Sequence, residues 1–476
     1  MLWLLAAPAF ASGYYYIDSG VRAIGRGGAN VVGADDLSAQ YFNPAALANI
    51  DRPTLNLQGW AASQYVRFDR ADEPENDLAF EPVENVSPPI YEPSGGFATH
   101  LGGLHPALKN THVAIGLYVP TAPYLAYDPE GAQRYQLQDS LIWQVYAGPS
   151  VAQEITPWLT VGAGLQYTFL RVEERIASTL CYTAQDPEDC QDPEFNKEEP
   201  TNDLDLSVSN WDPFQLSWNA GIIVTPHPMV QIGASVQPPI SYEAPGSLTA
   251  TFDEDFALAG QIDGLEFTDA DTLLKVTVPL VVRGGVQVLP TEDIRVELDG
   301  TFTQWSTMSE FRITDMNMKV QGAEGGFLEG QTIEVNDDIV FATGFQDAFS
   351  VRLGGDWRVT DWAQVRAGGH WESSAVPDTT VGVNLPDGDK FGFGLGGTFT
   401  IADRVALDVG FAHQLLGERT ITNSEARQQA LWTSLAEPEV SKVVPGKVVG
   451  NGQLASSVTY VAVGASVYFD AAKPRD

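Results

Sequence analysis

Hydrophobic and polar side chains alternate along much of this chain with a period of two residues. In residues 363–372, Val365 and Trp371 share one face, whereas Arg366 and Glu372 share the other. Such alternation is typical of β-strands, in which successive side chains point to opposite faces. It recurs in residues 294–302, 351–359 and 404–414. The pattern predicts a mostly β fold over residues 53–469, and by itself it fits a soluble sandwich as well as a membrane barrel.

The connections between the expected strands are of two kinds that alternate along the chain. Long polar loops are expected at residues 70–91, 178–205, 253–271, 314–338 and 420–453. Short turns are expected between them, at residues 156–158, 226–228, 291–293, 360–362 and 402–404. Short turns on one side and long loops on the other are typical of outer-membrane barrels. We therefore predict an all-β membrane protein, an antiparallel outer-membrane β-barrel of about fourteen strands, over residues 51–470.

Residues 12–50 do not alternate and are expected to form a separate segment before the barrel. Asn43 is a favourable helix N-cap, Pro44 suits the first helical position, and Ala45 begins a run of helix formers. A barrel of about fourteen strands has a lumen too wide for its own side chains to fill. We therefore expect this partly helical segment, here called the hatch, to plug the lumen.

The N-terminal residues suggest that the chain is exported. Residues 1–11 form an apolar run that closes on an A-x-A cleavage pattern, which predicts a signal peptide; an apolar N-terminal strand is the alternative. The run lacks a basic n-region, so the start codon is expected further upstream. Residues 471–476 are expected to extend beyond the last strand. In an oxidising compartment, Cys181 and Cys190 are expected to form a disulfide that closes a short acidic loop.

Composition excludes several classes of function. The chain has 26 Lys and Arg residues against 62 Asp and Glu residues, a formal charge of −36, so it repels the phosphates of nucleic acids. It has no C-x-x-C motif and no Cys/His cluster, so no metal site or other cofactor is expected. It also lacks an apolar stretch long enough for a transmembrane helix, which leaves the barrel as the route across a membrane.

Several motifs occur in a distinctive order along the chain. The hatch carries GVRAIGRGGA and GADDLSAQYFNPAALANI, with the Asn43-Pro44-Ala45 triplet, and the barrel carries WSTMSEFRI, GFQDAFSVRLGG, WAQVRAGGHWESSAVPD and LPDGDKFGFGLGGTF. Together these motifs resemble the FadL-type long-chain fatty acid transporters of the outer membrane. Each motif alone is weak, whereas the ordered set is specific. The chain departs from the family where it continues past Phe469 and in its long loop at residues 420–453.

The resemblance implies a multi-pass β-barrel in the outer membrane of a Gram-negative bacterium. It implies uptake of long-chain fatty acids, which bind inside the barrel and leave through a lateral opening in its wall. Aromatic or other hydrocarbons taken up by the same route are the alternative. An outer-membrane enzyme and a general porin are alternatives from other classes; no G-x-S-x-G motif is present, and the hatch argues against a porin. The expected partners are the hydrophobic ligand and outer-membrane lipid or lipopolysaccharide, around a monomer.

Charged residues provide candidates for binding a substrate and for holding the hatch. A fatty acid that enters ionised needs a cation for its carboxylate. Arg175 and Arg312 are the candidates, because both are expected near outer strand ends and the resemblance places them close to basic residues of the family's pocket; solvated rim arginines are the alternative. In the hatch, Arg22 and Arg26 are expected to pair with lumen acids such as Glu297 and Asp408.

Further residues are candidates for the path of an apolar tail. Residues 14–17 and Phe311, Phe341 and Phe345 could line its pocket, or could pack elsewhere. Pro120 and Pro123 lie inside an expected strand, where a proline cannot donate to the hydrogen-bond ladder. They mark a candidate lateral opening, with the strand's end at the rim as the alternative.

Overall fold

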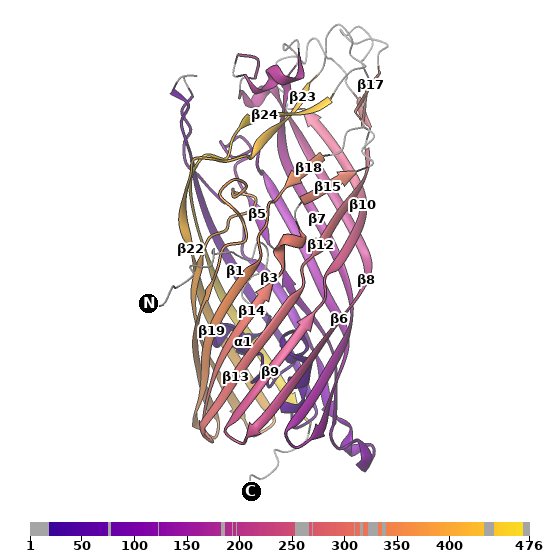
Figure 1. Cartoon of the computed structure of the whole chain (residues 1–476), viewed down its shortest axis with the longest axis vertical. Helices are drawn as coiled ribbons and strands as arrows, with labels where there is room; N and C mark the ends of the chain where they lie inside the picture. Colours follow the sequence, from indigo (N-terminus) through magenta and orange to yellow (C-terminus); the bar gives the residue numbers. More distant parts are fainter. Residues whose placement is uncertain are drawn as a thin grey trace, which may run out of the picture.

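The strands of the chain close into a barrel (Figure 1). The computed structural model describes residues 19–74, 78–121, 123–181, 186–192, 194–196, 198–252, 266–268, 270–308, 310–314, 318–321, 332–335, 339–432 and 442–469. The expected signal peptide and C-terminal extension lie outside these ranges. Strand β1 (Thr54–Arg70) pairs antiparallel with β3 (Ile90–His100) on one side and with β25 (Gly452–Tyr468) on the other, which closes the sheet. The barrel has 14 antiparallel strands, as predicted.

Some wall positions are filled by one strand and others by two in succession. The single strands are β1, β3, β6 (Asp139–Thr156), β7 (Leu159–Cys181), β8 (Asp203–His227), β20 (Ala363–Glu372), β21 (Lys390–Ile401), β22 (Val405–Ile421) and β25. The divided positions are β4 (Thr111–Thr121) with β5 (Tyr124–Ala126), β9 (Val230–Gln237) with β10 (Ile240–Phe252), β13 (Val281–Thr291) with β12 (Ala270–Val278), β14 (Ile294–Thr303) with β15 (Glu310–Thr314), and β19 (Ala348–Thr360) with β18 (Ile339–Ala342).

Prolines account for several of these divisions. Pro238 and Pro239 separate β9 from β10, Pro279 lies between β12 and β13, and Pro123 lies between β4 and β5. A proline has no backbone N–H to donate, so the ladder is interrupted there. Between β14 and β15, the short 3₁₀ turn η7 (Trp305–Thr307) turns the chain into the lumen instead, and Trp305 is buried.

The remaining elements lie inside the barrel or at its ends. The hatch contains α1 (Val21–Gly25), α2 (Ala39–Phe42) and the 3₁₀ helix η1 (Pro44–Asn49). Short strands outside the wall are β2 (Val83–Glu84), β11 (Glu266–Thr268), β16 (Met318–Gln321), β17 (Thr332–Val335), β23 (Arg427–Trp432) and β24 (Lys442–Val448). The other 3₁₀ turns are η3 (Leu101–Gly103), η4 (Pro106–Leu108), η5 (Pro187–Gln191) and η6 (Pro200–Asn202).

The wall is apolar outside and polar inside, the reverse of a soluble protein. On β14, Leu298 is 52% exposed, whereas its neighbours Glu297 and Asp299 are buried. Large apolar side chains are exposed in the same way on other strands: Leu57, Ile115, Leu165, Trp218, Leu353, Leu395 and Val463. An exposed apolar band around a closed barrel is the surface that a lipid bilayer requires. The expected short turns are confirmed, because each falls between consecutive paired strands. No helix in the described part of the chain is long and apolar enough to cross a membrane.

Candidate functional site

The hatch, described from Ser19 onward, lies in the lumen near the end with the short turns (Figure 1). Helix α1 packs against β20, β21, β22 and β25, whereas η1 packs against β4, β6, β7 and β8. The segment therefore spans the interior from one side of the wall to the other. Asn43 has two local roles. Its Oδ1 accepts a hydrogen bond from the Ala45 N–H (3.0 Å) and caps η1, and its Nδ2 donates to the Ile222 carbonyl oxygen (3.3 Å) and ties that end to β8.

Buried ion pairs attach the hatch to the wall. Arg22 lies 3.1 Å from Asp408 and Arg26 lies 2.7 Å from Glu297, so the predicted pairing of hatch arginines with these two lumen acids is confirmed. Arg26 also lies 3.5 Å from Asp356, which the sequence did not indicate. Each acid is fully or almost fully buried. An unpaired charge at such a place is costly, so each pair depends on both partners.

Wall carboxylates also bind the hatch backbone. Glu297 accepts hydrogen bonds from the N–H groups of Val32 (2.6 Å) and Gly33 (2.9 Å). Asp299 accepts from those of Asn30 (2.7 Å) and Val31 (3.0 Å). This loop of the hatch has no secondary structure to satisfy its N–H groups, so the wall supplies the acceptors. Sequence reasoning identified Glu297 but not Asp299, although both lie on the polar face of the same alternating segment.

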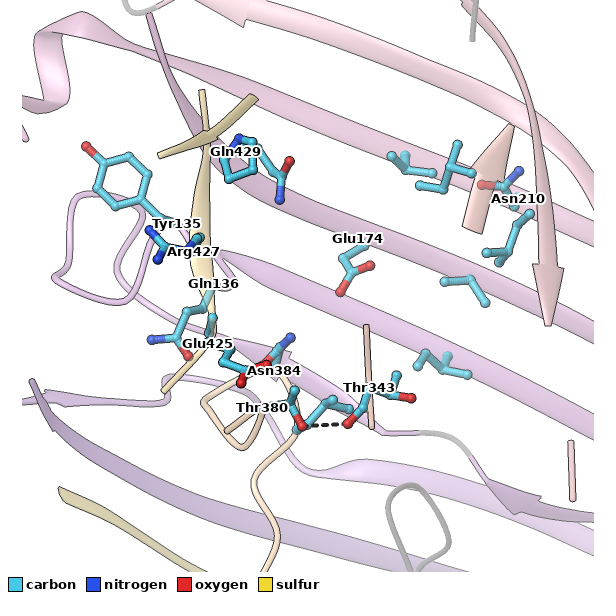
Figure 2. A pocket seen from close by; sticks show the side chains of 18 residues that line it. Tyr135, Gln136, Glu174, Asn210, Thr343, Thr380, Asn384, Glu425, Arg427 and Gln429 are labelled. Carbon is cyan, nitrogen blue, oxygen red and sulfur yellow. Dashed lines mark hydrogen bonds between the residues drawn. The ribbon is translucent and has the colours of Figure 1, made fainter. Parts of the chain in front are cut away.

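A cavity of about 270 Å³ lies toward the end with the long loops, above the hatch in the view of Figure 1, and Figure 2 shows the side chains that line it. Its apolar wall consists of Ile142, Val172, Val208, Leu274 and Ile313, one from each of five strands. Its polar side includes Tyr135, Gln136, Thr380, Asn384, Glu425, Arg427 and Gln429. The size is close to the lower end of the range of small-molecule sites, which is about 300–1,000 Å³.

The arginines that the sequence suggested for a carboxylate do not line this cavity. On β7, Val172 faces the cavity, so Arg175, an odd number of residues away, faces outward; it pairs with Asp139 across the strands at 2.8 Å. On β15, Arg312 stands opposite Lys275, whereas the next residue, Ile313, lines the cavity. Alternation in a strand therefore turns both arginines away from the lumen.

Sequence reasoning missed three charged residues that do line the cavity: Glu174, Glu425 and Arg427. Glu174 could have been found, because it has the parity of Leu170, Val172 and Ile176, the buried face of the same strand. Glu425 and Arg427 come from the long loop that folds back over the barrel, and no local pattern indicates that path.

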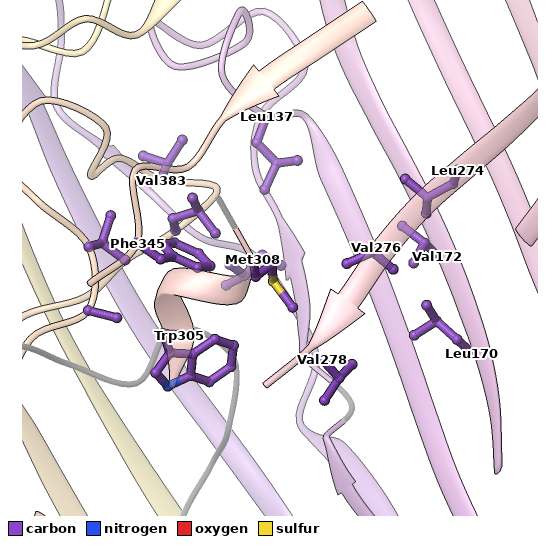
Figure 3. Close-up of a cluster of buried hydrophobic side chains, with 14 of the residues drawn as sticks. Leu137, Leu170, Val172, Leu274, Val276, Val278, Trp305, Met308, Phe345 and Val383 are labelled. Carbon is purple, nitrogen blue, oxygen red and sulfur yellow. The ribbon is translucent and has the colours of Figure 1, made fainter. Parts of the chain in front are cut away.

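An apolar cluster continues from the cavity down to the hatch. It includes Val172, Leu274 and Ile313 at the cavity and Tyr41 and Phe42 of the hatch. Figure 3 shows its middle part, with Val276 and Val278 on β12 and with Trp305, Met308 and Phe345 on the opposite side. Phe345, a candidate from the sequence, is thus part of this cluster. The side chains of Phe311 and Phe341, and residues 14–17, lie outside the part of the chain that the structure describes.

Tyrosines connect this cluster to strand β4. Tyr118 stacks on Tyr146 with ring centroids 5.3 Å apart and makes an edge contact with Tyr41 at 5.6 Å. Tyr118 precedes Pro120 on a strand whose pairing with β3 is incomplete. The β3–β4 ladder runs from His100 opposite His112 only as far as Gly95 opposite Leu117.

Beyond that point β3 pairs only with β1, although it continues to Ile90. Pro120 lies in the end of β4 that pairs with β6 but no longer with β3, and Pro123 lies just after β4. The side chains of Ile90 and Val119 pack together there and fill the space between the strands. The wall therefore has a local interruption of its hydrogen bonds that is closed only by side-chain contacts.

The hairpin of β23 and β24, here called the lid, lies across the open end of the barrel (Figure 1). β23 pairs in parallel with β7, with Ala430 opposite Thr179. Cys181 and Cys190 form a disulfide in the structure, and they pack against Ala430 and Trp432 of the lid. The expected loop-closing disulfide thus packs against the lid.

Ion pairs hold the lid to two other segments. Glu198 accepts from Arg70 Nη1 and Nη2 at 2.6 and 2.8 Å and lies 2.9 Å from Lys447 Nζ. Lys447 also lies 2.9 Å from Glu73. Burial raises the pKa of the Glu198 carboxyl, but Arg70 and Lys447 outweigh it and hold that pKa below its usual value. The cluster therefore joins the lid, the end of β1 and the disulfide loop at neutral pH.

Comparisons with known proteins agree with this architecture. Residues 2–457 match the model of the family described as outer membrane protein transport protein (OMPP1/FadL/TodX). A 47 kDa outer membrane protein of Pasteurella multocida (strain Pm70) is 25% identical over 229 residues, 48% of this chain and 49% of that protein. An outer membrane protein of Neisseria meningitidis serogroup B (strain ATCC BAA-335 / MC58) is 22% identical over 433 residues, covering 88% and 90% of the two chains.

Solved structures of similar fold include a Pseudomonas aeruginosa FadL homologue, with a TM-score of 0.72 at 17% identity, covering 96% of this chain and all of that one. The P. putida toluene transporter TodX has a TM-score of 0.62 at 13% identity, covering 96% of this chain and all of that one. At these identities the likeness shows the fold.

Proposed function

The chain belongs to the OMPP1/FadL/TodX family of outer membrane proteins, which transport hydrophobic substrates. We propose that it binds such molecules in the cavity under the lid and releases them sideways through the barrel wall. The resemblance seen in the sequence is thereby confirmed, as is location in the outer membrane. The proposal extends to a monomer whose apolar band contacts outer-membrane lipid and lipopolysaccharide.

The observation that carries the proposal is the continuous apolar lining between the cavity and β4. One cluster of buried side chains includes cavity residues such as Leu274 and also Tyr118, beside the interrupted β3–β4 ladder. Each buried methylene contributes about 0.8 kcal/mol, so an apolar molecule is stabilised along this whole path. The hatch blocks the alternative route straight down the barrel axis, which leaves the wall as the exit.

The lateral exit is assigned to the region of Pro120 and Pro123. Since β3 and β4 do not pair there, moving Ile90 and Val119 apart would break no strand hydrogen bond between β3 and β4. That makes the opening far less costly than separating a complete ladder. A substrate leaving there enters the bilayer and never crosses water.

Two substrate classes fit to different degrees. Uncharged hydrocarbons, as in the toluene transporters of similar fold, suit the apolar wall of the cavity best. Long-chain fatty acids, which the sequence resemblance implies, remain the second candidate because Arg427 lines the polar side and could meet a carboxylate. Arg175 and Arg312 face away from the cavity and are not part of the proposal.

Filling the cavity tests the proposed function. Leu274→Trp places a large side chain inside, whereas Leu273→Trp, one residue away on the same strand, places it on the outer face. Leu274→Trp should lower the affinity of the purified protein for a fluorescent apolar probe at least about tenfold, because a blocked cavity loses its contacts. Leu273→Trp should bind like the parent. Equal binding by all three proteins would place the site elsewhere.

A further inference from the structure

Glu174 is a carboxyl on the apolar face of β7, and its position rests on alternation. Val172 and Glu174 both line the cavity, and Val208 stands opposite Glu174 on β8. The neighbouring Glu173 pairs with Arg171 instead, on the face with Trp143, whose side chain is 41% exposed. Glu173 and Glu174 therefore have the same charge at adjacent positions but face opposite sides of the wall.

The cations near the cavity do not neutralise Glu174. Within the described ranges, Glu174 forms no ion pair with a Lys, Arg or His side chain. The basic residue that lines the cavity, Arg427, donates to Gln191 Oε1 (3.2 Å) and to the Gly446 carbonyl oxygen (3.0 Å). Arg175 follows Glu174 in sequence but pairs with Asp139 on the outer face.

A carboxyl in these surroundings affects which ligands can bind. It can accept a hydrogen bond from a ligand, and a positive ligand group would supply the missing partner. A ligand carboxylate next to it would place like charges together in an apolar site, which costs binding energy. The apolar wall makes similar contacts with any hydrocarbon tail, so Glu174 discriminates between ligands only through their polar end.

We propose that Glu174 determines which polar headgroup a ligand of this cavity can carry, an inference that rests on the proposed function. The cavity binds hydrophobic molecules that end in a hydrogen-bond donor or a positive charge, such as amines, alcohols or phenols. It binds them in preference to carboxylates of the same length. Fatty acids would then be the poorer ligands of this barrel. The residue acts on binding and takes part in no chemical step.

The test uses ligands with identical tails: dodecylamine, dodecanol and dodecanoate at pH 8. Each displaces a fluorescent apolar probe from the full-length protein in one detergent, and Glu174→Gln is compared with the parent so that partition into micelles cancels. Glu173→Gln is the matched control, since it removes the same charge one residue away on the outer face. Glu174→Gln should strengthen dodecanoate binding about tenfold and weaken dodecylamine binding about tenfold, with dodecanol changing less.

The outcomes separate this inference from the proposed function. If Glu174→Gln leaves the order of the ligands unchanged, or if Glu173→Gln changes it equally, Glu174 does not select the headgroup, even though the cavity binds. If the parent binds neither the probe nor any of these ligands, the proposed function fails and the inference fails with it.

Discussion

The lower and upper halves of the lumen are built from different kinds of contact. Around the hatch, Arg22 and Arg26 are buried against Asp408 and Glu297, and wall carboxylates accept hydrogen bonds from hatch N–H groups. Around the cavity, an aliphatic wall faces a polar side, and Glu174 has no cationic partner among the described residues. The carboxylates around the hatch come from β14, β19 and β22, whereas the apolar wall of the cavity comes from β6, β7, β8, β12 and β15.

The difference shows how one barrel can hold a plug and still exchange a ligand. A buried ion pair is directional and costly to break, so it fixes one position of the hatch. Apolar contacts are non-directional and depend mainly on area, so the cavity can accept and release molecules of several shapes. Charges are thus concentrated where the structure must stay in place.

Removing the hatch should have the largest effect. A chain lacking residues 19–50 should still assemble as a barrel, because the strand ladders close without the hatch. Its single-channel conductance in planar bilayers should rise strongly, since the lumen of a barrel this wide is then open to water. Unchanged conductance would show that the hatch does not block the axis.

A single broken pair should loosen the hatch without removing it. Arg26→Met leaves Glu297 and Asp356 without this partner and should cost the docked hatch about 3 kcal/mol, at the lower end of the range for a broken buried pair. Faster proteolysis within the hatch is the measurement. Arg67→Met, which removes a guanidinium from an exposed pair with Glu84 outside the hatch, is the control and should cleave like the parent.

Completing the hydrogen-bond ladder between β3 and β4 should reduce transport but leave ligand binding unchanged. Pro120→Val with Pro123→Val provides N–H groups for pairing, so the opening between β3 and β4 should close and uptake by cells should fall several-fold. Binding to the purified protein should stay unchanged, because the cavity is untouched. Pro149→Val, on β6 opposite Ile115, is the control. A parallel loss of binding would mean that these prolines shape the cavity instead.

Weakening the lid should have the smallest effect. Glu198→Gln loses the charged contacts to Arg70 and Lys447, each worth about 1.5–3 kcal/mol at most, and should speed ligand release modestly in stopped-flow measurements. Because the pKa of Glu198 is lowered in the folded protein, its contribution is present above the usual glutamate pKa and is lost only as the pH falls through the lowered value. The parent should therefore release ligand equally fast at pH 7 and pH 5. A faster release at pH 5 would assign lid closure to other groups.

Much of the architecture could be predicted from the sequence. Strict alternation over 294–302 and 363–372, together with the short turns, gives the strands and their order, because side-chain direction in a strand depends only on parity. The loss of alternation before residue 50 indicates the hatch. Pairing of Arg22 and Arg26 with acids on the polar face follows from the cost of an unpaired charge in a closed lumen.

The alternation of side chains along a strand also explains why the two arginines predicted to bind a carboxylate do not line the cavity. Arg175 and Arg312 are near the correct strand ends, but a shift of one residue exchanges the two faces of a strand. Glu174 and Ile313, their immediate neighbours, are the residues that line the cavity. The register against β6, β8 and β12 fixes which of two adjacent residues faces inward, and on β7 the parity of Leu170, Val172 and Ile176 already indicates Glu174.

The sequence by itself determined the strands, the hatch and the apolar outer surface, because these depend on local periodicity and on the solvent that each face meets. Tertiary structure alone decided the cavity. Its polar side is assembled from Tyr135, Asn384 and Arg427, which belong to connecting segments and a lid strand far apart in the chain. The sequence pattern of these segments does not predict which residues they contact. Their path depends on side-chain and ion-pair contacts that form only once the barrel has closed.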